Sequence, residues 1–331
     1  MRVTEREGTA AGGRATIDFR SVEKCRLCEA ERGRLTPWLH GVVDLDRPND
    51  EYVLLRCPQC GLIQTDPCPT EATLAALYAD GSSSDYEYPE IGFIGQLKER
   101  LAVAKVRAFA RQLLHPPESI LDFGTGAGRY ASAAATAFRN AVVCGTDFGA
   151  EPPAGSYYDR ALANLSYVQY DGLSSSARFD LILARHVLEH THDPVAMLRG
   201  LLERLTPGGT IYVEVPNAAS RTARLVLRRW PLWYVPKHLS HFDRSTLGAL
   251  IRAAGAQASI GKTEMPMMGN VLAIALGRSR FDPIFRVPGV LMFSVQLALE
   301  ALGRGGGTCI YAFVRRADSP ATSIENAPGI A

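Results

Sequence analysis

A strand that ends in a glycine-rich turn is the feature that most constrains this chain. Residues 120–128 read Ile-Leu-Asp-Phe-Gly-Thr-Gly-Ala-Gly, an apolar run that leads into three alternating glycines. Glycine lets the backbone turn sharply after a strand and lets a ligand approach with no Cβ in the way. A dinucleotide-binding loop would need a small residue three positions after its second glycine. That position is Arg129, so the loop does not suit a dinucleotide.

An acid beside this loop indicates the kind of ligand. Asp122 lies two residues before the first glycine. A carboxylate there would repel a pyrophosphate and attract an ammonium group. The loop residues Gly124, Thr125 and Gly126 therefore predict a ligand that is nucleoside-like, cationic and free of phosphate, which describes S-adenosylmethionine. A plain strand-to-helix turn is the alternative interpretation of this loop taken alone.

Two further acids follow apolar runs. Asp147 lies 25 positions after Asp122, and Asp171 ends the run that begins at residue 165. In a βαβ unit, an acid at the tip of the neighbouring strand accepts both ribose hydroxyls of a nucleoside. We expect Asp147 to do so, with Phe148 covering one adenine face. Asp171 and Gly172 are suitably placed for the adenine amino group.

The apolar runs alternate with segments of helical length. Two more runs, 178–186 and 208–217, continue the series, and a helix is expected after Asp193-Pro194. Strands that alternate with helices predict an α/β protein, in which a parallel sheet carries helices on both faces.

Together these segments resemble the class I S-adenosylmethionine-dependent methyltransferases over about residues 95–316. The resemblance rests on LDFGTGAGRY, VVCGTD, FDLILARHVLEHTHDP and KHLSHFDRSTLGALIRAAG. It implies a transferase with a Rossmann-like, seven-stranded sheet whose last strand is antiparallel, and residues 307–316 match that strand. It also implies that His186, at the end of the fourth strand, lies at the cofactor.

Four cysteines near the N-terminus form two C-x2-C knuckles 28 residues apart: Cys25, Cys28, Cys57 and Cys60. In a cytosolic protein this spacing favours a metal over disulfides. Four thiolates match a tetrahedral, structural Zn²⁺ site, so the sequence predicts a small zinc-ribbon-like module. Four unrelated free thiols are the alternative.

The segment after the second knuckle carries a second resemblance. Residues 60–67 read CGLIQTDP, and Tyr78, Tyr86 and Tyr88 follow. This phrase resembles the N-terminal domain of sugar C-methyltransferases that act on nucleotide-linked deoxysugars. It extends the resemblance back to about residue 22 and implies that Tyr86 or Tyr88 closes over the cofactor.

These observations predict five segments. They are a disordered tail at 1–21, a zinc-binding module at 22–70, a helical linker and cofactor lid at 71–116, the methyltransferase domain at 117–317 and a disordered tail at 318–331.

Five of the seven histidines fall into two short segments, 186–192 and 238–241. Imidazole titrates near neutral pH and can take a proton from a hydroxyl or an enol. His238 is the preferred general base, with His190 and His241 as further candidates. His238 matches the histidine of a Glu-His pair in the sugar C-methyltransferases, but Lys237 replaces the glutamate. That departure disfavours C-methylation and favours O-methylation.

A second metal is an alternative use of the first histidine segment. His186-Val-Leu-Glu189-His190 resembles the Glu-x-x-Glu-His stretch of ubiquinone-pathway O-methyltransferases, which is associated with a divalent metal. On one helix face such a set could bind a cation. Methyltransferases without any metal also carry Glu-His here, and a structural role for these histidines is the other interpretation.

Charge and hydropathy limit the partners. The net charge of +2 provides no general attraction for nucleic acid, and no secretory signal is visible, so we expect a cytoplasmic enzyme. Arg221, Arg224 and Arg228 share a face at helical spacing and would suit a phosphate. The helical stretch 287–302 would suit peripheral membrane contact. A solvated lid helix and a core-facing helix are the alternatives for these two stretches.

The sequence therefore predicts methyl transfer to an oxygen or carbon of a small molecule, such as a nucleotide-linked sugar or a related lipid-linked metabolite. Two other functions stay open. One is an RNA methyltransferase that uses the zinc module for RNA, and the other is a non-catalytic scaffold that binds the cofactor. The acceptor, the atom methylated and the oligomeric state are not determined.

Overall fold

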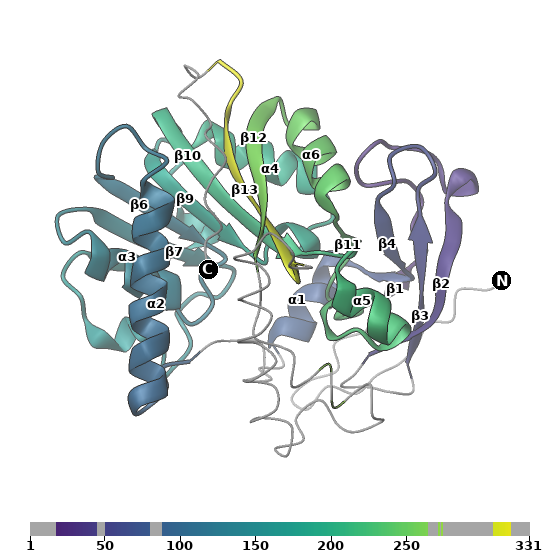
Figure 1. The fold of residues 1–331 in the computed structure, drawn as a ribbon, viewed down its shortest axis with the longest axis horizontal. Coiled ribbons are helices and arrows are strands. Elements are labelled where there is room, and N and C mark those ends of the chain that lie inside the picture. The colour runs from purple at the N-terminus through teal and green to yellow at the C-terminus, as the bar shows by residue number, and fades with distance from the viewer. Residues whose placement is uncertain are drawn as a thin grey trace.

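The computed structural model describes residues 18–44, 50–79, 88–263 and 307–318, with the isolated positions 271 and 273. Within these residues, the chain forms a large mixed sheet with helices on its faces and a smaller, mainly β unit beside it (Figure 1). Tyr86, the stretch 287–302 and most of both predicted tails lie outside the described residues.

The large sheet has seven strands in the order β12-β13-β10-β9-β6-β7-β8. Their bounds are Ser119–Phe123 (β6), Val142–Asp147 (β7), Leu165–Gln169 (β8), Phe179–Arg185 (β9), Leu205–Pro216 (β10), Ala256–Thr263 (β12) and Cys309–Arg316 (β13). Strands β10, β9, β6, β7 and β8 pair in parallel, whereas β13 is antiparallel to both of its neighbours. The predicted seven-stranded sheet with an antiparallel closing strand is confirmed.

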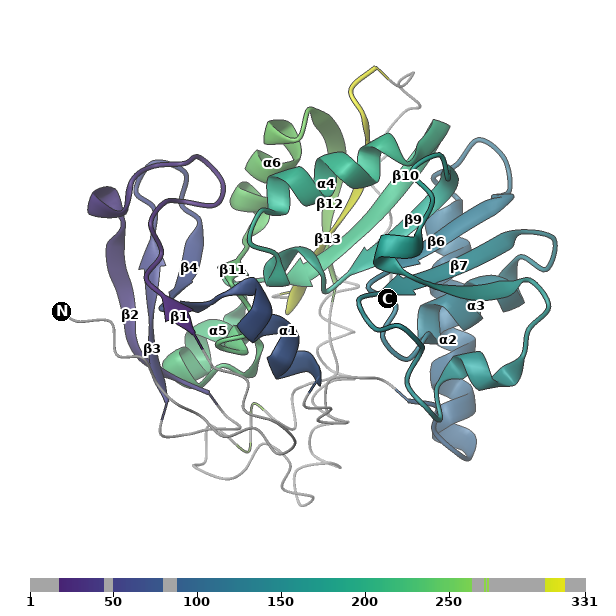
Figure 2. The ribbon, with the colours of Figure 1, turned by 180° about the vertical axis from the view of Figure 1, so that it is seen from behind.

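Helices cover both faces of this sheet. Helices α2 (Phe93–Ala110) and α3 (Arg129–Ala137) lie on one face, and α4 (Pro194–Glu203) and α6 (Arg244–Ala253) on the other (Figures 1 and 2). Successive side chains of a strand point to opposite faces. Along β9, Leu183 accordingly packs in the cluster that holds Phe109 of α2, whereas Ile182 packs in the cluster that holds Leu198 of α4. Both faces are apolar, which explains the continuous hydrophobic runs in the sequence.

The helix expected after Asp193-Pro194 is confirmed as α4. The Asp193 side chain accepts a hydrogen bond from the Ala196 N–H at 2.8 Å, and Pro194 occupies the first turn. An acid that caps the free N–H groups and a proline with a preset φ are both typical of a helix start. Among the described residues, no helix has the length and apolar character that crossing a membrane would need.

The smaller unit is built around a four-stranded sheet in the order β11-β4-β3-β2. Its strands are Thr36–Val43 (β2), Glu51–Arg56 (β3), Ile63–Asp66 (β4) and Ser240–His241 (β11). Phe19–Arg20 (β1), which the sequence analysis placed in the N-terminal tail, pairs antiparallel with Cys68–Pro69 (β5). Helix α1 (Glu71–Ala79) follows and lies between this unit and the large sheet (Figure 2).

The fourth strand of this unit comes from a distant part of the chain. Residues 218–242 leave the large sheet after β10 and pack on the N-terminal strands, where Trp230 and Trp233 are each 1% exposed. Burial of these two large rings with Leu54 and Val42 ties the segment to the smaller unit. The small module is thus completed by residues far outside the predicted range 22–70.

The predicted arginine face is wrong in its extent. Helix α5 (Arg221–Val226) ends before Arg228, because Leu227 adopts a left-handed φ of 47° and begins a short 3-10 helix, η6 (Leu227–Arg229). Of the three arginines, only Arg221 and Arg224 therefore lie on the α-helix. Arg228 lies in η6, which packs against β2. The remaining short 3-10 segments are η1 (Arg32–Arg34), η3 (Tyr157–Arg160), η4 (Tyr170–Gly172), η5 (Leu188–His190) and η7 (Pro231–Trp233).

Candidate functional site

The glycine loop follows β6 and leads into α3. Gly124, Gly126 and Gly128 have φ values of 71°, 53° and 82°, in the left-handed region that favours glycine. A Cβ on Gly124 would lie 2.5 Å from Cγ2 of Val187, which no side chain tolerates without movement. The turn therefore favours glycine at all three positions, and the close approach of the loop after β9 additionally requires it at Gly124.

Asp122 is buried at the end of β6, and its carboxylate accepts a hydrogen bond from the Thr125 hydroxyl at 2.8 Å. Burial raises the pKa of Asp122 to about 6, although the Thr125 bond and the charge of Arg185 act in the opposite direction. The buried carboxylate thus lies directly beneath the glycine loop, where the sequence predicts that it attracts a cationic group of the ligand.

Asp147 lies at the tip of β7, directly beside this loop. Its carboxylate accepts hydrogen bonds from the Gly126 N–H at 2.9 Å and the Phe148 N–H at 2.8 Å. The Phe148 ring is 68% exposed, which is unusual for a large apolar side chain. Asp171 and Gly172 lie in η4, just beyond β8, and are exposed. The predicted cofactor residues are therefore gathered along one edge of the sheet, at the carboxyl ends of β6, β7 and β8.

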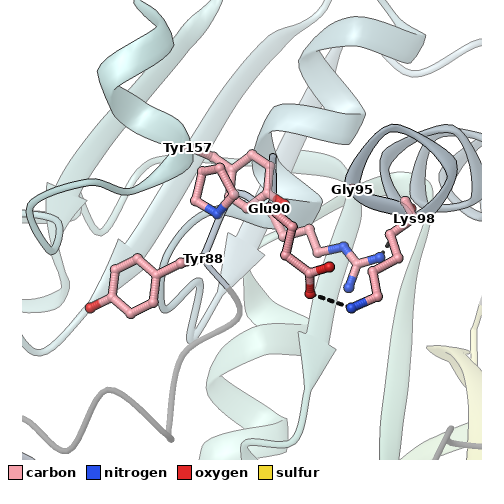
Figure 3. Close-up of a pocket in the computed structure, with 7 residues that line it drawn as sticks. Tyr88, Glu90, Gly95, Lys98 and Tyr157 are labelled. Carbon is pink, nitrogen blue, oxygen red and sulfur yellow. Dashed lines mark hydrogen bonds and ion pairs between the residues drawn. The ribbon is translucent and has the colours of Figure 1, made fainter. Parts of the chain in front are cut away.

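A cavity of about 320 Å³ adjoins the glycine loop. It is lined by Tyr88, Pro89, Glu90, Gly95, Lys98, Arg129 and Tyr157. Figure 3 shows the Glu90 carboxylate and the Lys98 ammonium joined in an ion pair near its wall. Residues 88–90, ahead of α2, form one part of the cavity wall, and Arg129, which follows the glycine loop, forms another. Tyr88, one of the two tyrosines predicted to close over the cofactor, thus lines the same cavity as Arg129.

His186 directly follows β9 and adopts a left-handed φ of 53°. Such a φ is costly for a residue other than glycine and is typical of functional sites. The predicted arrangement of His186 and His190 on one α-helical turn is therefore wrong, because the chain first turns at His186 and then forms the 3-10 segment η5. The two imidazoles consequently have different partners.

The His186 ring lies between two acids. Its Nδ1 is 3.1 Å from Oε1 of Glu189, and its Nε2 is 3.3 Å from Oε1 of Glu214. Burial favours the neutral ring, but the hydrogen bonds and charges of both carboxylates outweigh it and raise the pKa of His186 to about 9. Glu214 also accepts hydrogen bonds from Arg185 at 2.9 Å and from the Tyr212 hydroxyl at 2.6 Å. His186 is therefore a cation at neutral pH, held in a buried ionic network.

This network predicts that stability falls as the pH rises. A histidine whose pKa is higher in the folded state stabilises the fold fully below its unfolded value of about 6.5, and this contribution is lost as the pH passes through about 9. We expect the free energy of unfolding to decrease by about 1–3 kcal/mol across that window. Urea unfolding at a series of pH values, under reducing conditions, measures it. His186→Gln should flatten this slope and His115→Gln, at an exposed position, should not; equal slopes in all three proteins would contradict the assignment.

His190 and His238 form a second cluster, with their ring centroids 4.5 Å apart. His238 is 4% exposed, and its Nδ1 lies 2.9 Å from the carbonyl oxygen of Leu232. Because a carbonyl only accepts, Nδ1 carries the proton and donates it, which leaves Nε2 with a free lone pair. Burial, together with repulsion from the imidazoles of His190 and His241 when they are protonated, lowers the pKa of His238 well below its usual value. His238 is thus a neutral imidazole with one basic nitrogen.

His190 contacts Tyr78, which lies 112 residues earlier in the chain. Its Nδ1 is 3.0 Å from the carbonyl oxygen of Lys237 and 2.6 Å from the hydroxyl oxygen of Tyr78. Burial lowers the pKa of His190 despite the neighbouring Glu189 carboxylate. This contact of Tyr78 is not predictable from the sequence, where its place in the tyrosine-containing stretch after the second knuckle is the one available signal.

His241 occupies a different environment from the other two candidates for the base. It lies in β11, and its Nε2 is 2.9 Å from the Thr65 hydroxyl, which itself donates to the carbonyl oxygen of His238 at 2.7 Å. Burial, with a smaller effect of the Arg26 charge, lowers the pKa of His241 to about 3. These contacts favour a structural role for His241 over the predicted catalytic one.

A cation-binding arrangement also exists in this region. Glu189, His190 and His238 each offer one donor atom, and these atoms lie within 4.8 Å of one another. Glu189 is 1% exposed, and its Oε2 is buried with no hydrogen bond among the described residues. The predicted set is His186, Glu189 and His190. In the structure the ring nitrogens of His186 face Glu189 Oε1 and Glu214 Oε1. His238 takes the place of His186 in the set.

The four knuckle cysteines converge in the smaller unit. The sulfur atoms of Cys25 and Cys60 are 3.5 Å apart, as are those of Cys28 and Cys57, and all four lie within 4.8 Å of one another. A tetrahedral zinc ion with Zn–S bonds of about 2.3 Å would hold its sulfurs about 3.8 Å apart. The spacing fits a Zn²⁺ ion, and no disulfide joins the described cysteines.

Comparisons with known proteins identify relatives of this chain. A family model described as a methyltransferase domain matches residues 93–258. A ubiquinone biosynthesis O-methyltransferase of Pseudomonas putida is 28% identical over 165 residues, which cover 45% of this chain and 70% of that protein.

Solved structures are more distant. The plantazolicin methyltransferase BpumL, in complex with a monoazolic desmethylPZN analog and SAH, is 18% identical, with a TM-score of 0.47 over 73% of this chain and 93% of that one. The mitomycin 7-O-methyltransferase MmcR is 15% identical, with a TM-score of 0.43 over 68% of this chain and 55% of that one.

Proposed function

The chain belongs to the methyltransferase-domain family, and on that premise we propose that it transfers a methyl group to a hydroxyl oxygen of a small molecule, with His238 as the general base. It is a class I S-adenosylmethionine-dependent methyltransferase by its family and by its seven-stranded sheet. The observation that supports the choice of His238 is the contact between its Nδ1 and the carbonyl oxygen of Leu232. Its Nδ1–H is held by Leu232, so its Nε2 is free to take a proton.

The cofactor residues of this proposal are those at the ends of β6, β7 and β8. Asp147 would accept the ribose hydroxyls, because its carboxylate is already oriented by two backbone N–H groups. The exposed Phe148 ring offers a flat surface for the adenine. Asp122 offers a negative charge to the ammonium group. The complete set is Asp122, Gly124, Thr125, Gly126, Asp147, Phe148, Asp171, Gly172 and His186.

For this reaction the protein must position the acceptor hydroxyl beside the methyl group and remove the hydroxyl proton. When bound, S-adenosylmethionine supplies a methyl group that its sulfonium has already activated. His238 Nε2 would take the hydroxyl proton, and the Leu232 carbonyl would keep the ring oriented as it becomes charged. His190, with its ring against that of His238, is the second base candidate. Closed four-cysteine zinc sites are structural, so we place no chemistry on Cys25, Cys28, Cys57 and Cys60.

Asp147→Ala tests the cofactor assignment. We expect S-adenosylmethionine to bind about 10- to 100-fold more weakly, because two hydrogen bonds to a charged acceptor are lost. Calorimetry of wild type and variant measures this, and Glu203→Gln, at an exposed end of α4, is the matched control. Unchanged affinity in Asp147→Ala would remove the assignment. Binding without methylation of any acceptor would favour the non-catalytic scaffold.

Several classes of hydroxyl compound are candidates for the methyl acceptor. The Pseudomonas putida relative is named as an O-methyltransferase, which agrees with a histidine base acting on a hydroxyl. The nucleotide-linked sugar suggested by the sequence resemblance stays a prediction. A screen for S-adenosylhomocysteine release should therefore compare nucleotide-linked sugars with aromatic hydroxyl compounds.

A further inference from the structure

Lys237 places a positive charge among aromatic side chains. Its Nζ donates a hydrogen bond to the Tyr234 hydroxyl at 3.1 Å. The same atom lies 5.0 Å from the centroid of the Tyr78 ring and 5.2 Å from that of the Tyr234 ring. Both distances are within the range of cation–π attraction. The ammonium is therefore held between two phenol rings, one from α1 and one from the loop ahead of β11.

The same two rings contact the proposed base and its neighbour. The Tyr78 hydroxyl oxygen is 2.6 Å from His190 Nδ1, and the Tyr234 ring centroid is 5.2 Å from that of His238. The Lys237 ammonium, the two phenols and the two imidazoles thus form one contiguous group. Tyr78, Tyr234, His190 and Lys237 are half-buried, whereas His238 is buried behind them.

The chemistry of this group limits the hydroxyl that it can deprotonate. His238 is buried and packs against the rings of His190 and Tyr234, where water cannot solvate a positive imidazole, so an ordinary alcohol with its weakly acidic hydroxyl is a poor proton donor to it. Proton transfer becomes favourable when the hydroxyl is itself acidic and when a cation lies close to the oxygen that becomes negative. In surroundings of low polarity, such a cation acts more strongly than it would in water.

We propose that Lys237 stabilises the oxyanion of the methyl acceptor, and that the acceptor is an acidic hydroxyl on a flat unsaturated system, a phenol or an enol. This inference rests on the proposed function. In the step, the O–H bond breaks and its proton goes to His238 Nε2, while the oxygen forms a bond to the methyl carbon. The electrons of the carbon–sulfur bond return to sulfur, which yields S-adenosylhomocysteine, and His238 then releases its proton to water.

The first test uses 4-nitrophenol, whose visible absorbance reports ionisation of its hydroxyl directly. The probe is titrated with acid and base in the presence of the full-length protein saturated with S-adenosylhomocysteine. In wild type we expect the bound phenol to ionise at a lower pH than free phenol. Lys237→Met should reverse this, with about a tenfold weaker ionisation constant, whereas Lys237→Arg should keep most of the effect because it retains the charge. Lys262→Met, at an exposed position of β12, is the matched control and should behave as wild type.

The second test compares 4-nitrophenol with 4-nitrobenzyl alcohol, which has a similar ring and a far less acidic hydroxyl. We expect methylation of the phenol alone, with a kcat that falls at least about tenfold in Lys237→Met. Calorimetry of S-adenosylmethionine binding checks that each variant is folded, because the proposed cofactor residues lie at the ends of β6, β7 and β8, away from the loop that carries Lys237.

Three results would overturn the inference. They are the same titration of bound phenol in wild type and Lys237→Met, absence of saturable phenol binding to wild type, and methylation of a nucleotide-linked sugar that is indifferent to Lys237→Met. The last result would leave the proposed function intact, provided that the reaction still required His238. If folded wild-type protein does not bind S-adenosylmethionine, the proposed function itself is contradicted.

Discussion

Replacing His238 by asparagine should lower kcat for methyl transfer by about 10²- to 10⁴-fold, the usual contribution of a general base. Asparagine is suited to the position because its amide N–H₂ can replace Nδ1–H as the donor to the Leu232 carbonyl. The variant then lacks only the nitrogen that takes the proton. S-adenosylmethionine affinity should remain unchanged, because Asp122, Asp147 and Phe148 lie on the strand ends and not in this loop.

The measurement is initial-rate kinetics with the acceptor found in the screen, together with calorimetry of the cofactor. His115→Asn, at an exposed position outside the site, is the matched control and should be active. His190→Asn should have a smaller effect than His238→Asn if His238 is the base, and the reverse order would assign the proton transfer to His190. Undiminished activity in His238→Asn would contradict the base assignment. Activity that depends on added Mg²⁺ or Mn²⁺ would instead favour a cation held by Glu189, His190 and His238.

The second large effect concerns the cysteine site. Cys57→Ser should remove bound zinc and lower the free energy of unfolding of the small module by several kcal/mol, because the binding free energy of the metal in such sites stabilises the folded state. Zinc content by mass spectrometry and thermal unfolding by circular dichroism measure both. Cys144→Ser, a buried cysteine in β7 outside the quartet, should keep its zinc. A zinc-free Cys57→Ser protein with wild-type stability would contradict the structural role.

Loss of zinc should also reach the active site. Arg26, between the first two knuckle cysteines, donates to the Leu239 carbonyl at 3.2 Å, and Thr65 donates to the carbonyl of His238 at 2.7 Å. The small module therefore supports the segment that carries the base. We expect Cys57→Ser to lower kcat at least about tenfold while the affinity for S-adenosylmethionine changes little. Equal losses of both would indicate global unfolding and not a local loss of support.

The cofactor edge is the part of the site that local sequence predicted best. The glycines of residues 124–128 do adopt left-handed φ values, and Asp147 does end the strand next to them. These features depend on a strand, a turn and the next strand, and short windows of sequence carry that information. The prediction of an α-helical turn at His186 failed, because contacts with Glu189 and Glu214 hold this residue in a strained conformation that its own propensity would not select.

The acceptor side was predicted less completely. Sequence reasoning selected His238 and His190, but not the Tyr78 hydroxyl that bonds to His190 or the Lys237 ammonium between two rings. Tyr78 and His190 are 112 residues apart in the chain. Nothing in either local pattern requires them to meet, and a contact of that separation depends on the path of the whole chain.

The sequence by itself determined the alternation of strands and helices, the glycine turn with its acids and the four-cysteine set, because each follows from the chemistry of neighbouring residues. Only the tertiary structure decided that residues 218–242 return to the N-terminal module, where Ser240–His241 become its fourth strand. The physical reason is burial. Trp230 and Trp233 lose their exposure to water only when this segment packs on Val42 and Leu54, which lie almost 200 residues earlier in the chain. That packing sets the position of His238, and with it the proposed chemistry.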